Sequence, residues 1–79
     1  MNKERKRRLD AIVSNLQDAL SELEDIRFEE QDAYDNMPES FQQTERGEQI
    51  QQNADDLSDA YDDLDSVIEA IVEILDNNQ

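Results

Sequence analysis

The chain has 79 residues, enough for one domain at most, and it contains neither cysteine nor histidine. These absences exclude disulfide bonds and thiolate or imidazole metal sites, and they argue against an enzyme. The net charge is −15, but the apolar residues recur with a fixed helical period, which favours a folded chain over a disordered one.

The first eight residues form a basic arm with a net charge of +4, whereas the rest of the chain carries −19. Cations are unfavourable at a helix N-terminus. An antiparallel second helix would offset this, because its acidic end, with Glu69, Glu73 and Asp76, would lie beside the arm. We expect the arm to balance charge in this way. The alternative is contact with phosphates or a partner, through the only candidates for direct nucleic-acid binding: Lys3, Arg5, Lys6, Arg7 and Arg8.

The spacing then predicts a long helix from about residue 4 to residue 35. Leucines recur every seven residues, with apolar residues three and four positions after them, as on one side of a helix. Arg27 and Glu30 interrupt this stripe. They indicate either loosened packing near the turn or a polar feature that fixes register, a role that Asn53 could share on the second helix.

Residues 36–44 are predicted to form the connecting turn. Asn36 is a good helix-ending residue, and Pro38 disfavours helix before it and can open a short helical turn after it. The second helix begins either with Ser40 as its cap or with Thr44, and the sequence leaves both open. We expect Met37 and Phe41 to cover the end of the apolar stripe.

The second helix is predicted to run from Glu45 to Asp76 if Thr44 is its cap. Ile50, Leu57, Leu64 and Ile71 recur every seven residues, and the opposite side is almost entirely acidic. With a turn near residue 40, Arg27 would face Asn53 and Ala33 would face Gly47 in an antiparallel pair.

The predicted fold is therefore an all-α, two-helix hairpin that forms a single domain over residues 1–79. Its apolar stripes are three positions wide in each heptad, which is the width of a bundle face. We expect a homodimer that forms a four-helix bundle. The interface residues expected to remain partly exposed in a lone hairpin are Val13, Leu20, Ile68, Val72 and Leu75.

The side chains offer little for catalysis or for cofactor and metal binding, so we expect none of the three. Asp55, Asp56 and Asp59 are similar to the start of a calcium-binding loop, but its turn glycine and final glutamate are not at the required spacing. No stretch is long and apolar enough to span a bilayer, so we expect a cytoplasmic protein without membrane contact.

The acidic side of the helices is the strongest functional signal. We expect a binding module that mimics DNA and inhibits a host nucleic-acid-handling or defence protein by occupying its basic groove. The alternative is a structural protein that uses its apolar stripe for oligomerisation or for binding a partner helix. The expected acidic surface comprises Asp18, Glu22, Asp25, Glu29, Asp32, Asp55, Asp56, Asp59, Asp62 and Asp63.

Residues 35–47 carry a distinctive segment, Asp-Asn-Met-Pro-Glu-Ser-Phe-Gln-Gln-Thr-Glu-Arg-Gly, followed by the acidic heptads. This pattern resembles small acidic proteins of phages, prophages and mobile elements of Gram-positive bacteria. The resemblance implies a role in host interaction or counter-defence, in the cytoplasm of the host cell. It assigns no functional residue.

Overall fold

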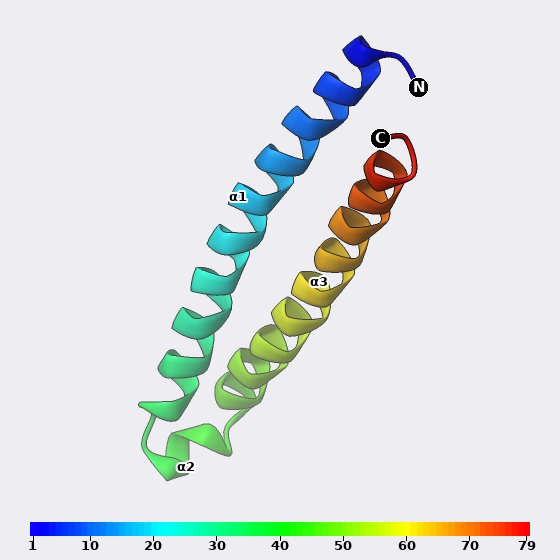
Figure 1. Ribbon diagram of the computed structural model, residues 1–79. Helices are drawn as coiled ribbons and strands as arrows, with labels where there is room; N and C mark the ends of the chain where they lie inside the picture. Colours follow the sequence, from blue (N-terminus) through cyan, green and yellow to red (C-terminus); the bar gives the residue numbers. More distant parts are fainter.

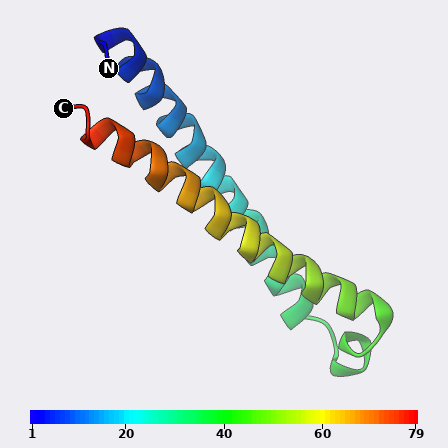
Figure 2. The ribbon, with the colours of Figure 1, turned by 90° about the vertical axis from the view of Figure 1, so that its right-hand side faces the viewer.

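The computed structural model describes all 79 residues and contains three helices and no strand. Helix α1 spans Lys3–Asp35, α2 spans Glu39–Gln42 and α3 spans Glu45–Asp76. Helices α1 and α3 lie side by side and run in opposite directions, with α2 at the end where they are joined (Figures 1 and 2). The result is a rod 59 Å long and about 15 Å across. The all-α prediction is confirmed.

Local capping explains where the helices begin and end. The Asn2 side chain accepts a hydrogen bond from the Arg5 backbone N–H at 2.8 Å, which caps α1. Asn36 ends α1, as expected. The Thr44 hydroxyl accepts from the Gly47 N–H at 3.3 Å, so Thr44 is the cap of α3. Ser40 instead lies inside α2.

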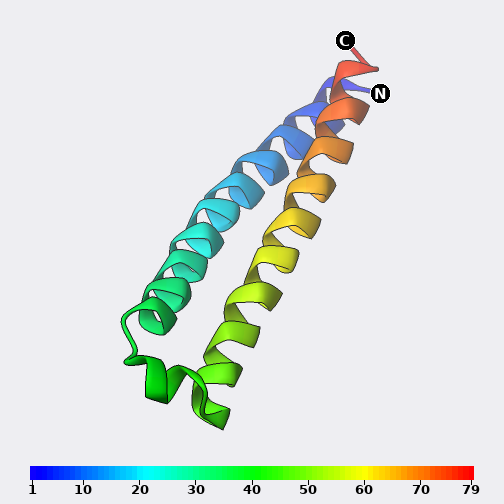
Figure 3. The ribbon, with the colours of Figure 1, turned by 90° about the horizontal axis from the view of Figure 1, so that it is seen from below.

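The connection is compact because α2 packs against both long helices (Figure 3). The Gln42 side-chain amide donates to the Tyr34 carbonyl at 3.0 Å, which ties α2 to the end of α1. A Cβ atom added at Gly47 would lie 2.5 Å from the Phe41 and Gln42 carbonyl oxygens, so only glycine fits there. Ala33 was expected to be the residue packed closely against Gly47, but the residues in that position are Phe41 and Gln42 of α2. Phe41 is 57% exposed and does not cover the apolar stripe.

The two long helices meet along a seam with spacings that alternate between four and three residues, as in coiled coils. Every seam residue is buried or half-buried. Only Ala54, 2% exposed, and Ile68, 5% exposed, are buried hydrophobic residues, so the pair has very little interior. The seam comprises Leu9, Val13, Leu16, Leu20, Leu23, Arg27, Glu30 and Tyr34 of α1, and Ile50, Ala54, Leu57, Tyr61, Leu64, Ile68, Ile71 and Leu75 of α3.

The register of the two helices differs from the expected one by about one helical turn. The Asn53 side-chain amide donates to Glu30 at 3.3 Å, whereas Arg27 was expected opposite Asn53. Arg27 instead lies over the ring of Tyr61, 4.8 Å from its centroid. The apolar periodicity tolerates such a slide, because leucines still meet apolar residues after it. In the observed register Asn53 pairs with Glu30 and Arg27 lies against Tyr61.

Candidate binding surfaces

The acidic surface consists of the ten carboxylates expected from the sequence, and all ten are exposed. They occupy positions on α1 and α3 that lie outside the seam. The only ion pair in the molecule joins Arg7 to Glu4 at 2.7 Å, so no cation within the chain neutralises this surface. The carboxylates of this surface therefore face solvent without a neighbouring cation.

Neighbouring amides hold some of these carboxylates in place. Gln51 donates to Asp55 at 3.1 Å, and Gln52 donates to Asp56 at 2.9 Å, each from one helical turn earlier. No group of three or more acidic side chains converges closely enough to hold a metal ion. The helices also contain no segment with the length and apolar character that crossing a membrane requires.

A second surface is apolar and runs along one side of the pair. Its four large residues are between 44% and 50% exposed, although isoleucine and valine are usually buried. Each residue immediately precedes a seam residue, and in an antiparallel pair these positions lie on the same side of the seam. We call this side the open apolar face. It comprises Ile12, Ala19, Ile26 and Ala33 of α1, and Ala60, Val67 and Ile74 of α3.

The open apolar face differs from the interface expected from the sequence. Ile68 was expected to remain partly exposed but is buried in the seam. Val13, Leu20, Val72 and Leu75 are half-buried, as expected, but the open apolar face does not include them. Val13, Leu20 and Leu75 lie in the seam, and Val72 lies on the opposite, mostly polar side. A stripe three positions wide does not show which two of its rows will meet the other helix. When two of these rows pack in the seam between the helices, the third row stays exposed and forms the open apolar face.

The seam becomes polar towards α2, where side chains of the two helices pair. The Arg27 guanidinium lies 4.8 Å from the ring centroids of both Phe28 and Tyr61, within range of cation–π attraction. The nearby Glu24 carboxylate, which favours the protonated phenol, is the main cause that raises the pKa of Tyr61 above its usual value. Together with the contact between Asn53 and Glu30, these interactions join the helices at defined positions.

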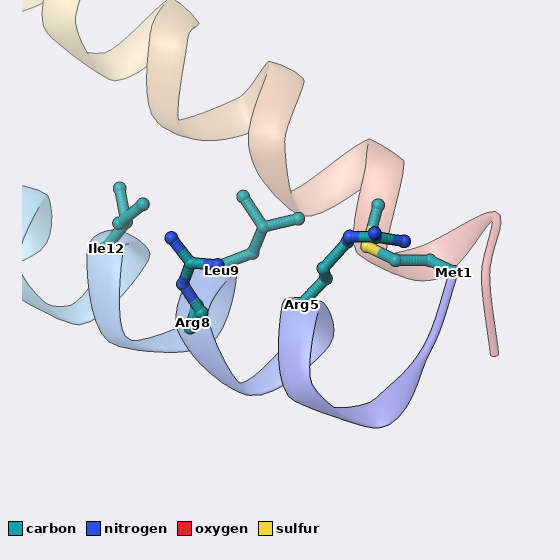
Figure 4. Close-up of a pocket in the computed structure, with 5 residues that line it drawn as sticks. All are labelled: Met1, Arg5, Arg8, Leu9 and Ile12. Atoms are coloured by element: carbon teal, nitrogen blue, oxygen red, sulfur yellow. The ribbon is translucent and has the colours of Figure 1, made fainter.

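The basic arm lies beside the C-terminal end of α3, as expected, and the Met1 amine donates to the Asn78 side-chain oxygen at 3.2 Å. The expected ion pairs with Glu69, Glu73 and Asp76 do not form. The only ion pair of the arm is the local one between Arg7 and Glu4. The arm instead lines a shallow pocket of about 290 Å³ with Met1, Arg5, Arg8, Leu9 and Ile12. In Figure 4 the side chain of Arg8 lies beside those of Leu9 and Ile12, and the side chain of Arg5 lies between those of Leu9 and Met1. Two cations without an ion-pair partner therefore lie at one end of the open apolar face.

The other end of this face carries acidic residues. A shallow groove near α2 is lined by Glu30, Glu45, Arg46, Gln49 and Ile50. Arg46 lies seven residues before Asn53 and fourteen before Ala60, so it continues the α3 row of the open apolar face. The face thus runs from a cationic pocket to a groove with two carboxylates.

Comparison of the chain with protein-family models, with curated proteins and with solved structures finds no match. The two surfaces and their charges are therefore the features of this chain that bear on its function.

Proposed function

We propose that this chain is a non-enzymatic binding module whose acidic surface occupies a basic groove on another protein, in the manner of a DNA mimic. The observation that carries the proposal is the exposure of all ten carboxylates without a neutralising ion pair. From Leu9 onward the chain carries −19, and spread over the 59 Å rod this is one charge per roughly 3 Å. Duplex DNA carries one charge per about 1.7 Å.

The partner follows from this chemistry. A groove that binds nucleic acid presents lysines and arginines, so it attracts a rigid rod with a similar density of negative charge. The resemblance to phage and mobile-element proteins favours a nucleic-acid-handling or defence protein of the host as the target. Association would be fast and would weaken steeply as salt rises.

The test is affinity capture from host lysate at low and high salt, followed by displacement with excess duplex DNA. The altered protein carries asparagine at Asp55, Asp59, Asp62 and Asp63, and its matched control carries glutamate at the same four positions. We expect the wild type and the glutamate control to retain a protein that salt and duplex DNA release. The asparagine variant should retain none, while its circular dichroism stays helical. Equal capture by all three proteins would refute the proposal.

Assembly is a second function, and we propose that the chain also forms a homodimer with a four-helix core. Only two hydrophobic residues are buried in the single chain, whereas Ile12, Ile26, Val67 and Ile74 are exposed on one side. Apolar surface arranged in this way is typical of a helix pair that packs against another. A dimer would have a charge of −30, twice the −15 of one chain, along a rod of similar length. Self-association would therefore raise the charge density of the proposed mimic.

A further inference from the structure

We propose that two copies of this chain pack with their open apolar faces together and their long axes in opposite directions. The basic arm of each copy then lies over the acidic groove near α2 of the other. This inference rests on the homodimer proposed above and does not depend on the target of the acidic surface. It specifies which residues meet and in which orientation.

The open apolar face of α1 is complementary to itself under this arrangement. A two-fold axis beside Ala19 brings Ala19 opposite the partner's Ala19 and Ile12 opposite the partner's Ile26. Ile26 in turn meets the partner's Ile12. The small residue lies at the centre, where identical side chains must face each other, and two larger pairs flank it.

The open apolar face of α3 has the same property. An axis beside Val67 brings Val67 opposite the partner's Val67 and Ala60 opposite the partner's Ile74. The pairing of a small with a large residue keeps the packed volume even. The Glu30–Asn53 and Arg27–Tyr61 contacts place Ala19 level with residues 64–69, a range that includes Val67. A single axis can therefore serve both helices.

The charges that border this face select the orientation. The bordering residues lie four positions before each member of the face. On α1 they are Arg8, Asn15, Glu22 and Glu29. On α3 they are Asp56, Asp63 and Ala70, and the row continues to Asn77. In opposite directions, Arg8 faces the partner's Glu29 and Asn15 faces the partner's Glu22. Asp56 faces the partner's Asn77, and Asp63 faces the partner's Ala70. No carboxylate of this border meets another.

The same-direction dimer lacks this advantage. There α1 would pack on the partner's α3, so Glu22 would face the partner's Asp63 and Glu29 would face the partner's Asp56. Each of these like-charge contacts would occur twice by symmetry. Directly opposed like charges are destabilising, and a dimer with a charge of −30 has few cations to relieve them.

The ends of the molecule give an independent reason for the same orientation. Arg5 and Arg8 have no ion-pair partner within the chain, and they line the pocket at one end of the open apolar face. Glu30, Glu45 and Arg46 line the groove at the other end, which therefore has one more carboxylate than cations. Only packing in opposite directions brings each cationic pocket to an acidic groove.

The available area is sufficient for a stable dimer. A face 59 Å long and 15 Å wide measures roughly 900 Å² on each copy. Stable protein interfaces bury about 800 Å² on each partner. The contact would cover the four large apolar residues that the single chain leaves exposed.

Single cysteines test the orientation, because the chain has no native cysteine. We expect Ala19→Cys and Val67→Cys each to form covalent dimers with a short bifunctional thiol reagent. Ala33→Cys is the matched control on the same row, and it should not link because it would face the partner's Arg5. Linking only in a mixture of Ala19→Cys with Val67→Cys would overturn the proposal, since that result identifies the same-direction dimer. A wild type that remains monomeric in analytical ultracentrifugation would overturn it as well.

A charge exchange tests the border contact. Arg8→Glu should raise the dissociation constant of the dimer by about threefold to tenfold, the scale of exposed ion pairs. Adding Glu29→Arg to this variant should restore dimerisation, because the pair is then present in reverse. Failure of the exchange to restore dimerisation would contradict the proposed orientation.

These measurements use the purified chain alone, so they do not depend on the proposed function of the acidic surface. Salt separates the two further. Rising salt should strengthen the dimer, because it screens the repulsion between two chains of −15. The same change should weaken capture of a basic partner.

Discussion

The half of the seam near the chain termini and the half near α2 are built from different chemistry. Near the termini, Leu16 and Leu20 of α1 pack along α3, which contributes Leu64 and Ile68. Near α2, seam positions on α1 hold Arg27 and Glu30 instead. The same heptad spacing continues through both halves, so the backbone does not cause the difference.

The two halves of the seam contribute differently to the stability of the helix pair and to its register. Apolar contacts are non-directional, and leucines would still meet apolar residues after a slide of one turn. The Asn53 amide and the Arg27 guanidinium require a partner at a particular place, so they penalise such a slide. We infer that the apolar half supplies most of the stability and that the polar half fixes the alignment.

The largest expected effect comes from the apolar half. Ile68→Ala should lower the free energy of unfolding by about 2 to 5 kcal/mol, because it removes a buried side chain and leaves a cavity. Urea unfolding followed by circular dichroism measures this loss. Ser66→Ala, on the exposed side of the same helix, is the matched control and should change stability by less than about 0.5 kcal/mol. Equal effects of the two changes would contradict the role given to the apolar half.

A smaller effect is expected in the polar half. Glu30→Ala and Asn53→Ala, measured singly and together, should show a coupling energy of about 0.5 to 1.5 kcal/mol. The Gln31 and Asp35 pair, which is hydrogen bonded within α1, is the control. Its coupling should be smaller, because it stays intact in any register. Additive effects of Glu30→Ala and Asn53→Ala would show that their contact does not hold the helices in place.

The smallest effect is a pH dependence that should also arise in the polar half. The pKa of Tyr61 is raised, chiefly by the nearby Glu24 carboxylate, so folding favours the protonated phenol. This contribution is complete below the unfolded-state pKa of about 10 and is lost as the pH rises through the higher folded-state value. Thermal unfolding above pH 10 should show a loss of stability that Tyr61→Phe removes.

Tyr34→Phe is the control for that measurement, since it leaves Tyr61 as the only tyrosine in the chain. An ultraviolet titration of this variant should place tyrosinate formation at a higher pH when folded than in urea. Coincident titrations would mean that the contact with Glu24 is too weak to matter.

The parts of the fold that local chemistry controls could be predicted from the sequence. Asn36 ends the first helix as expected. The sequence left Ser40 and Thr44 open as caps of the second helix, and the range Glu45–Asp76 is the one predicted with Thr44. Alignment could not be predicted, because it depends on contacts such as that between Asn53 and Glu30 across the two helices. The predicted register assumed a turn centred near residue 40. It did not allow for the residues of α2, which lengthen the connection between the two long helices.

For the two surfaces, too, one part could be predicted from the sequence and another could not. Heptad position predicted the exposed carboxylates, because charged residues opposite an apolar stripe face water. The apolar face was assigned to residues such as Ile68, because a three-row stripe does not show which row stays open. The ion pairs of the basic arm were also predicted wrongly. Long arginine side chains can reach several partners, and the sequence alone does not choose among them.

The near absence of an interior has a consequence for how this chain behaves at different abundances. With only Ala54 and Ile68 shielded among its hydrophobic residues, a lone copy has little protection against opening and cleavage by proteases. Under the proposed pairing, each additional copy shifts the balance towards the folded form by mass action. Lifetime in the cell would then rise with expression level.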